Sequence, residues 1–488
     1  MIVIGAGVGG LTAAALLTQA GYPVTVLEAQ SYPGGSAGTF FHKGYRFDAG
    51  ATLAGGFAPG GPHARLGELL NLDWPVASVD PAWVVHLGDH KIIQWADAER
   101  WKDERRGQLP GSESFWAAQE RMAGISWRIS SGKFPWPPNR LIDWWDLTRS
   151  LKPWVMPAVP YLLAPVSSMF PRNPPPELKP FVDAQLIISA QTTSEHAAAL
   201  YGAAALDLPR RGVSHVRGGM GGIAQTLADW LKAHGSQVLF RQKVDQVIPR
   251  KNRVAAVRTT KGLEFEADFV VANLTPWGLA KILGEASPVG LQHEIQMRQP
   301  GWGAFILYLG LREDAIPVEV ASHHQVVRDS TQSLGEGNSV FISISEREDV
   351  SQAPAGYRAA TLSTHTAVDE WWRLAEADPA AYAARKEEYT EKVLRTAEIA
   401  VPGIRRAVEL ILPGTPITFE RYTNRPLGMV GGFAQTSILA ARGPQTGFAN
   451  LWLVGDSVFP GQSTAGVTLG AMRVATDVLR EIHQGWRG

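Results

Sequence analysis

The sequence contains no cysteine among its 488 residues. This absence excludes disulfides, thiolate metal sites and a cysteine nucleophile. It also excludes a prosthetic group tethered through a cysteine side chain. We therefore expect any organic cofactor to be bound non-covalently.

The chain also lacks a net charge, because 46 Lys and Arg residues balance 46 Asp and Glu residues. Nucleic-acid-binding domains usually carry a basic excess on one face, so we expect no nucleic-acid partner. Its histidines show neither metal-ligand spacing nor an evident acid–base partner, so we expect no metal site.

No segment combines the length and helical character that a membrane-spanning helix requires. The apolar run 154–165 contains three prolines, which break helices. Tryptophans and basic residues are nevertheless concentrated around it, which predicts helices lying in a membrane interface. The alternative is an internal helical subdomain with a core of aromatic residues. The residues concerned are Trp136, Trp144, Trp145 and Trp154, with Lys133, Arg140, Arg149, Lys152, Arg172 and Lys179.

The most informative stretch is the first thirty residues, where an apolar strand meets a glycine turn and an Ala/Leu-rich helix. Gly5 permits a tight turn, Gly7 allows close approach of a pyrophosphate, and Gly10 allows the helix to pack on the strand. The strand 24–27 ends at Glu28, whose carboxylate is placed to bind ribose hydroxyls. This order of elements predicts dinucleotide binding.

Two further stretches decide which dinucleotide is bound. A second glycine cluster, 33–38, is followed by the segment 45–52, and near the other end a buried strand runs into Gly455 and Asp456. Asp456 is placed to accept from a ribityl hydroxyl, and the helix that follows would direct its N-terminal amides at a flavin ring. Taken together, the three stretches predict FAD.

These stretches resemble the bacterial-type phytoene desaturase family of FAD-dependent carotenoid desaturases and isomerases, and most closely the carotenoid 3,4-desaturases. The resemblance rests on the glycine turn, the PGG and FDAGAT segments, 414–421 and GDSVFPGQSTAGV, although Ser36 stands where many members carry an arginine. It implies bound FAD, a long polyene substrate, membrane lipid contact, and a quinone or oxygen as electron acceptor. The residues assigned to the cofactor are Gly5, Gly7, Val8, Gly9, Gly10, Glu28, Ala29, Gly34, Gly35, Ser36, Gly50, Ala51, Thr52, Val244, Gly455, Asp456, Gly466 and Val467.

The predicted fold class is α/β, with a Rossmann-like FAD-binding domain of the GR2 flavoprotein type and a mixed-sheet substrate domain. A helical, membrane-associating subdomain completes it. The FAD-binding domain comprises 1–60, 210–280 and 413–488, the substrate domain 61–130 and 281–412, and the helical subdomain 131–209. Because the cofactor strand begins at once, we expect no cleavable signal and a peripheral location on the cytoplasmic side of a membrane.

The chemistry is expected to reside in the flavin, with the protein supplying position and a dry site. Candidate polar groups near the ring are Glu420, Arg421 and Arg425, and candidate substrate neighbours are Trp302, Phe305 and Tyr308. The favoured function is desaturation of an acyclic carotenoid, with or without a 1-hydroxyl group, at the 3,4 position. The alternatives are a carotenoid cis-trans isomerase using reduced FAD, a flavin amine oxidase, and a non-catalytic carotenoid-binding protein.

Overall fold

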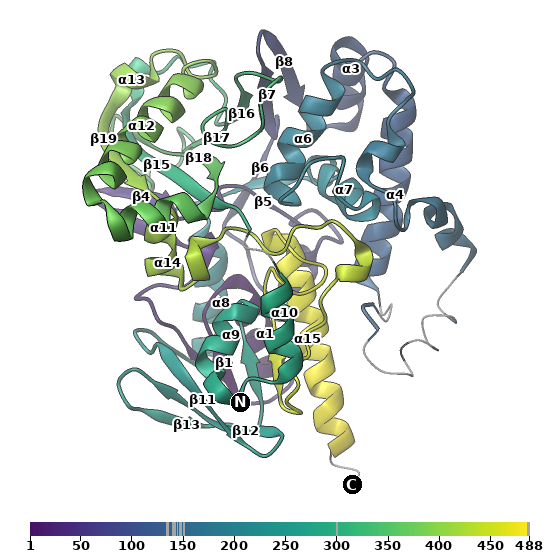
Figure 1. Ribbon diagram of the computed structural model, residues 1–488, viewed down its shortest axis with the longest axis vertical. Helices are drawn as coiled ribbons and strands as arrows, with labels where there is room; N and C mark the ends of the chain where they lie inside the picture. Colours follow the sequence, from purple (N-terminus) through teal and green to yellow (C-terminus); the bar gives the residue numbers. More distant parts are fainter. Residues whose placement is uncertain are drawn as a thin grey trace.

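The computed structural model describes residues 1–132, 136–138, 143, 145, 149, 152–298 and 301–485 (Figure 1). The predicted tryptophan position at 144 and the basic positions at 133 and 140 lie outside these residues. Within them the chain forms two large sheets and a separate group of helices. In Figure 1 the parallel sheet occupies the lower part, and the second sheet and the helical group stand side by side above it.

The lower sheet is parallel, and three distant parts of the chain supply its strands. The strand order is β10 (Gln237–Leu239), β2 (Thr25–Leu27), β1 (Ile2–Ile4), β14 (Val270–Ala272) and β20 (Leu451–Leu453). Alternate residues enter two different cores, as the two-residue period of a strand requires. Apolar residues on both faces explain why these short strands read as continuous hydrophobic runs.

Helices cover one face of this sheet, and a small antiparallel sheet with two helices covers the other. The first face is covered by α1 (Val8–Gln19), α8 (Gly221–Ala233) and α15 (Thr464–Gly485). The second face is covered by β11 (Val244–Arg250), β12 (Arg253–Thr259), β13 (Glu264–Glu266), α9 (Pro276–Leu283) and α10 (Val289–Met297). This layered arrangement confirms the Rossmann-like part of the predicted fold class.

The second sheet has seven strands and is mixed, also as predicted. Its order is β19 (Val408–Gly414), β15 (Gly303–Arg312), β18 (Tyr357–Thr366), β17 (Ser339–Ile344), β16 (His323–Val327), β7 (Trp83–Leu87) and β8 (His90–Gln94). Only the β16–β7 pair is parallel. The hairpin formed by β7 and β8 therefore closes one edge of this sheet.

The two faces of the seven-stranded sheet differ in what covers them. On one face α11 (Val368–Ala377) and α12 (Pro379–Ala397) pack on the sheet, and the Phe305 ring stacks on Trp371 with centroids 5.6 Å apart. Tyr308 lies three residues further along β15 and faces the opposite side, among Tyr45 and Phe47. The prediction of Phe305 as a substrate neighbour is therefore corrected, because its side chain is fully buried in the helix-covered core.

The helical group packs on strands β7, β8 and β16 and shares an aromatic core with them. It contains α3 (Ala98–Gln108), α4 (Glu113–Ser131), α6 (Leu178–Ser189) and α7 (Ala199–Leu206), with 3-10 segments at Pro153–Tyr161 and Val166–Met169. Among the described residues, no helix is both long and apolar enough to cross a membrane. The shorter elements that connect these parts are β3 (Thr39–His42), β4 (Tyr45–Asp48), β5 (Ala54–Gly55), α2 (Pro62–Leu70), β6 (Val76–Val79), β9 (Val213–Val216), α13 (Ile404–Ala407) and α14 (Pro416–Thr423).

The fully buried Asn450 side chain should be the largest single polar contributor to the stability of the junction before β20. Its amide accepts from Val254 N at 2.7 Å and donates to the carbonyls of Val254 and Asp268 at 2.8 and 2.7 Å. We predict that Asn450→Leu lowers the free energy of unfolding by about 3 kcal/mol, because three backbone groups lose their partner. Urea denaturation measures this, and the exposed Asn252→Ala serves as the control.

Candidate functional site

The glycine turn between β1 and α1 brings backbone groups closer than side chains would allow. Gly5 has a φ of +92° and donates its N–H to Leu27 O at 2.8 Å. A Cβ on Gly10 would lie 2.3 Å from Gly5 O, which is a rigid backbone atom. No side chain caps the N-terminus of α1 at Gly7, so its first amides remain available to an anion.

Glu28 follows β2 directly and is oriented by two backbone amides. Its carboxylate accepts from Ala6 N and Gln30 N, each at 2.7 Å, and the side chain is buried. Burial raises the pKa of Glu28, and these amide hydrogen bonds lower it in part. Each carboxylate oxygen has a second lone pair, so the group retains the capacity to accept from two neighbouring hydroxyls.

Asn273, which directly follows β14, lies at the centre of the site. Its Nδ2 would be 2.3 Å from a Cβ on Gly7, and its Oδ1 would be 3.1 Å from a Cβ on Gly9 or Gly455. The absent Cβ of Gly7 thus makes room for this amide. A polar residue directly after a buried strand was the only signal for this position in the sequence.

The second glycine cluster is joined to the turn by hydrogen bonds. Gly34 has a φ of +119° and donates its N–H to Ala6 O at 2.8 Å. The Ala51 N–H donates to Ser36 O at 3.1 Å. Tyr308 Oη donates to Ala49 O at 2.7 Å and so fixes the same segment to the seven-stranded sheet. The structure therefore brings residues 34–36 and 50–52 beside the first turn.

The C-terminal motif arrives at the same place. Gly455, which has a φ of +125°, adjoins the Asn273 amide, and a Cβ on Gly9 would lie 2.9 Å from Val467 Cγ1. Val467 is in the first turn of α15, next to Gly466. All three predicted stretches thus converge, although each comes from a different region of the sequence.

Arg425, one of the candidate polar groups near the ring, has a structural role. Its guanidinium pairs with Asp456 at 2.9 Å, donates to Met429 O at 2.8 Å, and also donates to Gly431 O. It therefore fixes the loop 426–431 against the Gly-Asp motif. Glu420 and Arg421 lie on α14, where Arg421 is exposed. Neither has a contact that assigns it a catalytic role.

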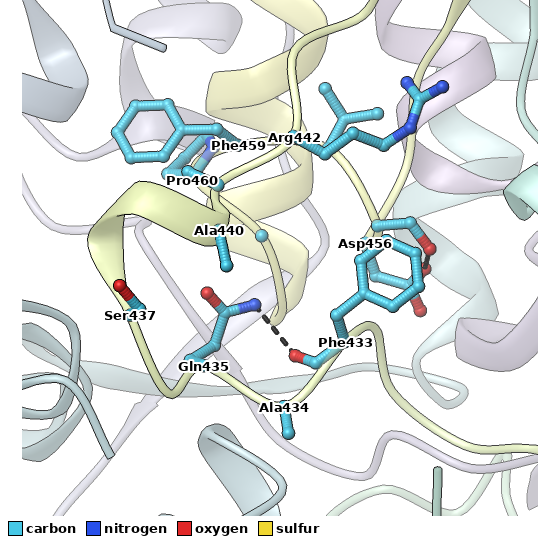
Figure 2. A pocket seen from close by; sticks show the side chains of 13 residues that line it. Phe433, Ala434, Gln435, Ser437, Ala440, Arg442, Asp456, Phe459 and Pro460 are labelled. Atoms are coloured by element: carbon cyan, nitrogen blue, oxygen red, sulfur yellow. Dashed lines mark hydrogen bonds between the residues drawn. The ribbon is translucent and has the colours of Figure 1, made fainter. Parts of the chain in front are cut away.

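Asp456 also borders the pocket shown in Figure 2. Its lining includes Phe433, Gln435, Arg442 and Phe459 together with Asp456. Gln435 Nε2 donates to Phe433 O at 2.9 Å. Arg442 is buried and pairs with Glu294 at 3.1 Å. The loop 433–442 therefore forms one wall of the cavity beside the Gly-Asp motif.

The remaining predicted residues lie at the margins of this assembly. Val244 is buried in β11, close to the segment whose Gln242 N–H donates to Glu28 O at 2.7 Å. Ala29 follows Glu28 directly. Trp302 is half-buried beside His365, and its carbonyl accepts from Val430 N at 2.8 Å.

These features fit the adenosine diphosphate half of FAD. An uncapped helix N-terminus suits the pyrophosphate, and a buried carboxylate suits the ribose. The glycines that follow β1 and β20 add no side chain to the crevice, where the Asn273 amide after β14 lies. This half would be held by Gly5, Gly7, Gly9, Gly10 and Glu28. The flavin half would be met by Asp456 and residues 50–52.

Comparison with known proteins agrees with this geometry. Residues 8–479 match the family model described as flavin containing amine oxidoreductase. The chain belongs to this family, and it is an FAD-dependent oxidoreductase.

The relatives include carotenoid enzymes. The prolycopene isomerase of Arabidopsis thaliana is 28% identical over 98% of this chain and 82% of its own length. The neurosporene-forming phytoene desaturase of Cereibacter sphaeroides is 24% identical, covering 96% of this chain and 92% of its own. An oxidoreductase structure from Methanosarcina mazei aligns with a TM-score of 0.62 and 19% identity over 97% of this chain and 99% of that one. The resemblance to the phytoene desaturase family is thus confirmed.

The contact between Gly7 and Asn273 generates a prediction about FAD retention. Gly7→Val would place a Cβ and two methyl groups where the Asn273 amide lies, so we expect the purified protein to lose its FAD. Gel filtration followed by acid precipitation measures the released yellow cofactor. Gly107→Ala on α3, where an added Cβ meets nothing within 4 Å, should keep FAD fully. Equal flavin content in both variants would contradict the prediction.

Proposed function

We propose that this protein desaturates an acyclic carotenoid near its end, at the 3,4 position. The observation that carries the proposal is similarity along almost the whole chain to enzymes whose names specify phytoene or prolycopene. When bound, the flavin supplies two-electron oxidation of a C–C bond by accepting a hydride. A quinone or oxygen then serves as the final electron acceptor.

The protein's own residues fix the segments on both sides of the cofactor site. Arg425 fixes the loop 426–431 beside Asp456, and Tyr308 fixes the Ala49 carbonyl on the sheet. Apolar side chains, among them Phe47 and Ile306, surround the Tyr308 ring. A polyene offers no charge and few hydrogen-bonding groups, so its recognition must depend on such apolar contact.

The second candidate function is cis-trans isomerisation of a carotenoid. It is favoured by the prolycopene isomerase of Arabidopsis thaliana, the relative with the higher identity of the two described above. An isomerase needs no net electron acceptor. The two functions therefore differ in the mass of the product.

Incubation of the FAD-loaded protein in liposomes with a hydroxylated acyclic carotenoid and a quinone tests the proposal. We expect a product lighter by two hydrogens, with absorption at longer wavelength because the chromophore is longer. Unchanged mass with a changed cis band would favour the isomerase. Putrescine in place of the carotenoid tests for amine oxidation, and bleaching of the flavin by putrescine alone would overturn the proposal.

We further propose that the protein attaches to membranes peripherally, on the cytoplasmic side, without crossing them. Met156, Val159 and Leu163 expose 63%, 50% and 75% of their surface, and Trp145 exposes 56%. Lys152, also exposed, adds a positive charge beside this apolar surface. Trp154 packs partly against the aromatic core and under Arg128, so it contributes less to the surface than its neighbours.

Liposome flotation tests the attachment. The triple variant Met156→Ser, Val159→Ser and Leu163→Ser should bind vesicles containing anionic lipid more weakly, because burial of apolar area in the interface is lost. Three apolar residues outside this surface are similarly exposed, namely Val289, Val318 and Met297. Their replacement by Ser should leave vesicle binding unchanged. Equal flotation of the two triple variants would refute the attachment surface.

A further inference from the structure

A polar cavity adjoins the segment 48–52, which reaches the cofactor site. The residues that line it include Thr52, Asp48, His323, Ser343 and Gln352. A row of side chains crosses four neighbouring strands on the sheet face opposite α11 and α12. It consists of Tyr308, Thr361, Ser343 and His323. The cavity therefore lies between that face and the cofactor-proximal residues 48–52.

The hydrogen bonds of His323 determine which of its nitrogens carries the proton. Ser343 Oγ donates its only hydrogen to Thr52 Oγ1 at 2.7 Å, so it must accept from His323 Nδ1 at 2.9 Å. Burial lowers the pKa of His323 to about 3, which keeps the ring neutral. Nε2 therefore has a bare lone pair. It is buried and has no hydrogen-bond partner among the described residues.

Gln352 presents a second acceptor in the same cavity. Its Oε1 is buried and also lacks a partner among the described residues, and the side chain as a whole is only 4% exposed. Each of these buried acceptors costs free energy unless a donor reaches it. A water molecule has two hydrogens and suits a polar cavity of this kind.

We propose that this cavity binds a water molecule through His323 and Gln352, and that this water accepts the proton released during desaturation. A water that donates both hydrogens keeps its oxygen lone pairs free. Because His323 and Gln352 withdraw its hydrogens, the oxygen becomes a better proton acceptor. Thr52 lines the same cavity and lies in the segment joined to the glycine cluster.

The proton and electron balance of the reaction requires such an acceptor. In the proposed desaturation one substrate carbon would give up a hydride, which bound FAD would accept, and the neighbouring carbon would lose a proton to the water oxygen. The electron pair of that second C–H bond closes the new double bond. The water then transfers a proton to the Asp48 carboxylate and is regenerated.

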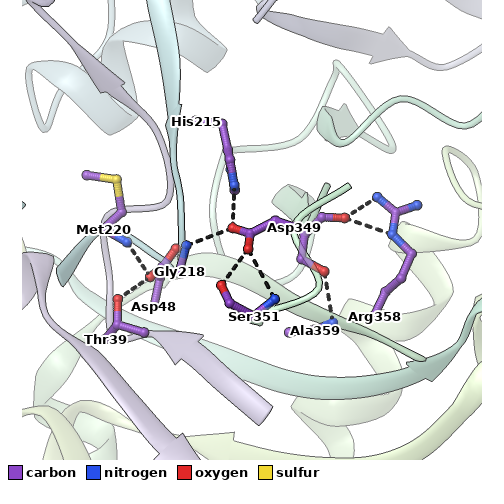
Figure 3. Close-up of polar contacts among 10 residues, drawn as sticks. Thr39, Asp48, His215, Gly218, Met220, Asp349, Ser351, Arg358 and Ala359 are labelled. Atoms are coloured by element: carbon purple, nitrogen blue, oxygen red, sulfur yellow. Dashed lines mark hydrogen bonds and ion pairs between the residues drawn. The ribbon is translucent and has the colours of Figure 1, made fainter. Parts of the chain in front are cut away.

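Asp48 is suited to hold this proton. Its Oδ1 accepts from Thr39 Oγ1 at 2.6 Å and from Met220 N at 2.8 Å (Figure 3). Burial raises the pKa of Asp48 to about 6. At neutral pH the carboxylate is therefore ionised but close to its protonated form, and exposed Arg46 on the same cavity wall marks the route to solvent.

A crystal structure of the FAD-bound protein at high resolution tests the water site without any substrate. We expect an ordered water within hydrogen-bond distance of both His323 Nε2 and Gln352 Oε1. Its absence would overturn the inference. The inference rests on the proposed desaturation, but this measurement does not, so a protein that fails to desaturate can still show the water.

Kinetics test the role of the water. Gln352→Met removes Oε1 at similar volume and should lower kcat by about 10²-fold, as expected for loss of a general base, with KM and the Kd for FAD unchanged. Gln352→Glu keeps an acceptor oxygen and should recover most of the rate. Gln119→Met is the control, because Gln119 is as buried but donates to Ala203 O in the helical group. A kcat for Gln352→Met within about twofold of the parent would overturn the assignment.

Discussion

The close approach of three strand ends is the constraint on which the cofactor site depends. The ends of β1, β14 and β20 meet around the Asn273 amide, and only glycine at positions 7, 9 and 455 leaves room for it. Since parallel strands present their carboxyl ends at one edge of the sheet, this edge is where a ligand crevice forms. The discontinuous course of the chain follows, because the strands 270–272 and 451–453 must return to β1.

The same constraint explains how the two sheets are joined. The chain leaves the glycine cluster through residues 48–52, and the seven-stranded sheet holds this segment through Tyr308 and Ser343. On the other side, Arg425 ties the loop after α14 to Asp456. The crevice is therefore fixed from both sides by side chains that come from elements far apart in sequence.

Local patterns were sufficient to predict the parts of the site that lie within one supersecondary unit. Gly5, Gly10 and Glu28 follow from a strand, a turn and a helix in order, and their geometry agrees with that order. Asn273 and His323 could not be predicted in this way, because their partners lie across strands paired over long sequence separations. Phe305 was misplaced because an entirely buried strand gives no alternation that would identify its two faces.

The polar row on β15 to β18 also bears on how reaction type is determined in this fold. A polyene offers little beyond apolar contact, so the buried His323 Nε2, which has no partner among the described residues, is costly unless a donor reaches it. Desaturation releases a proton in every turnover, whereas an isomerisation returns any proton that it removes. A cavity lined by Thr52 and Asp48 would therefore be of more use to a desaturase. Variants in this row can test which of the two activities the protein has, whereas the glycine motifs are shared by both.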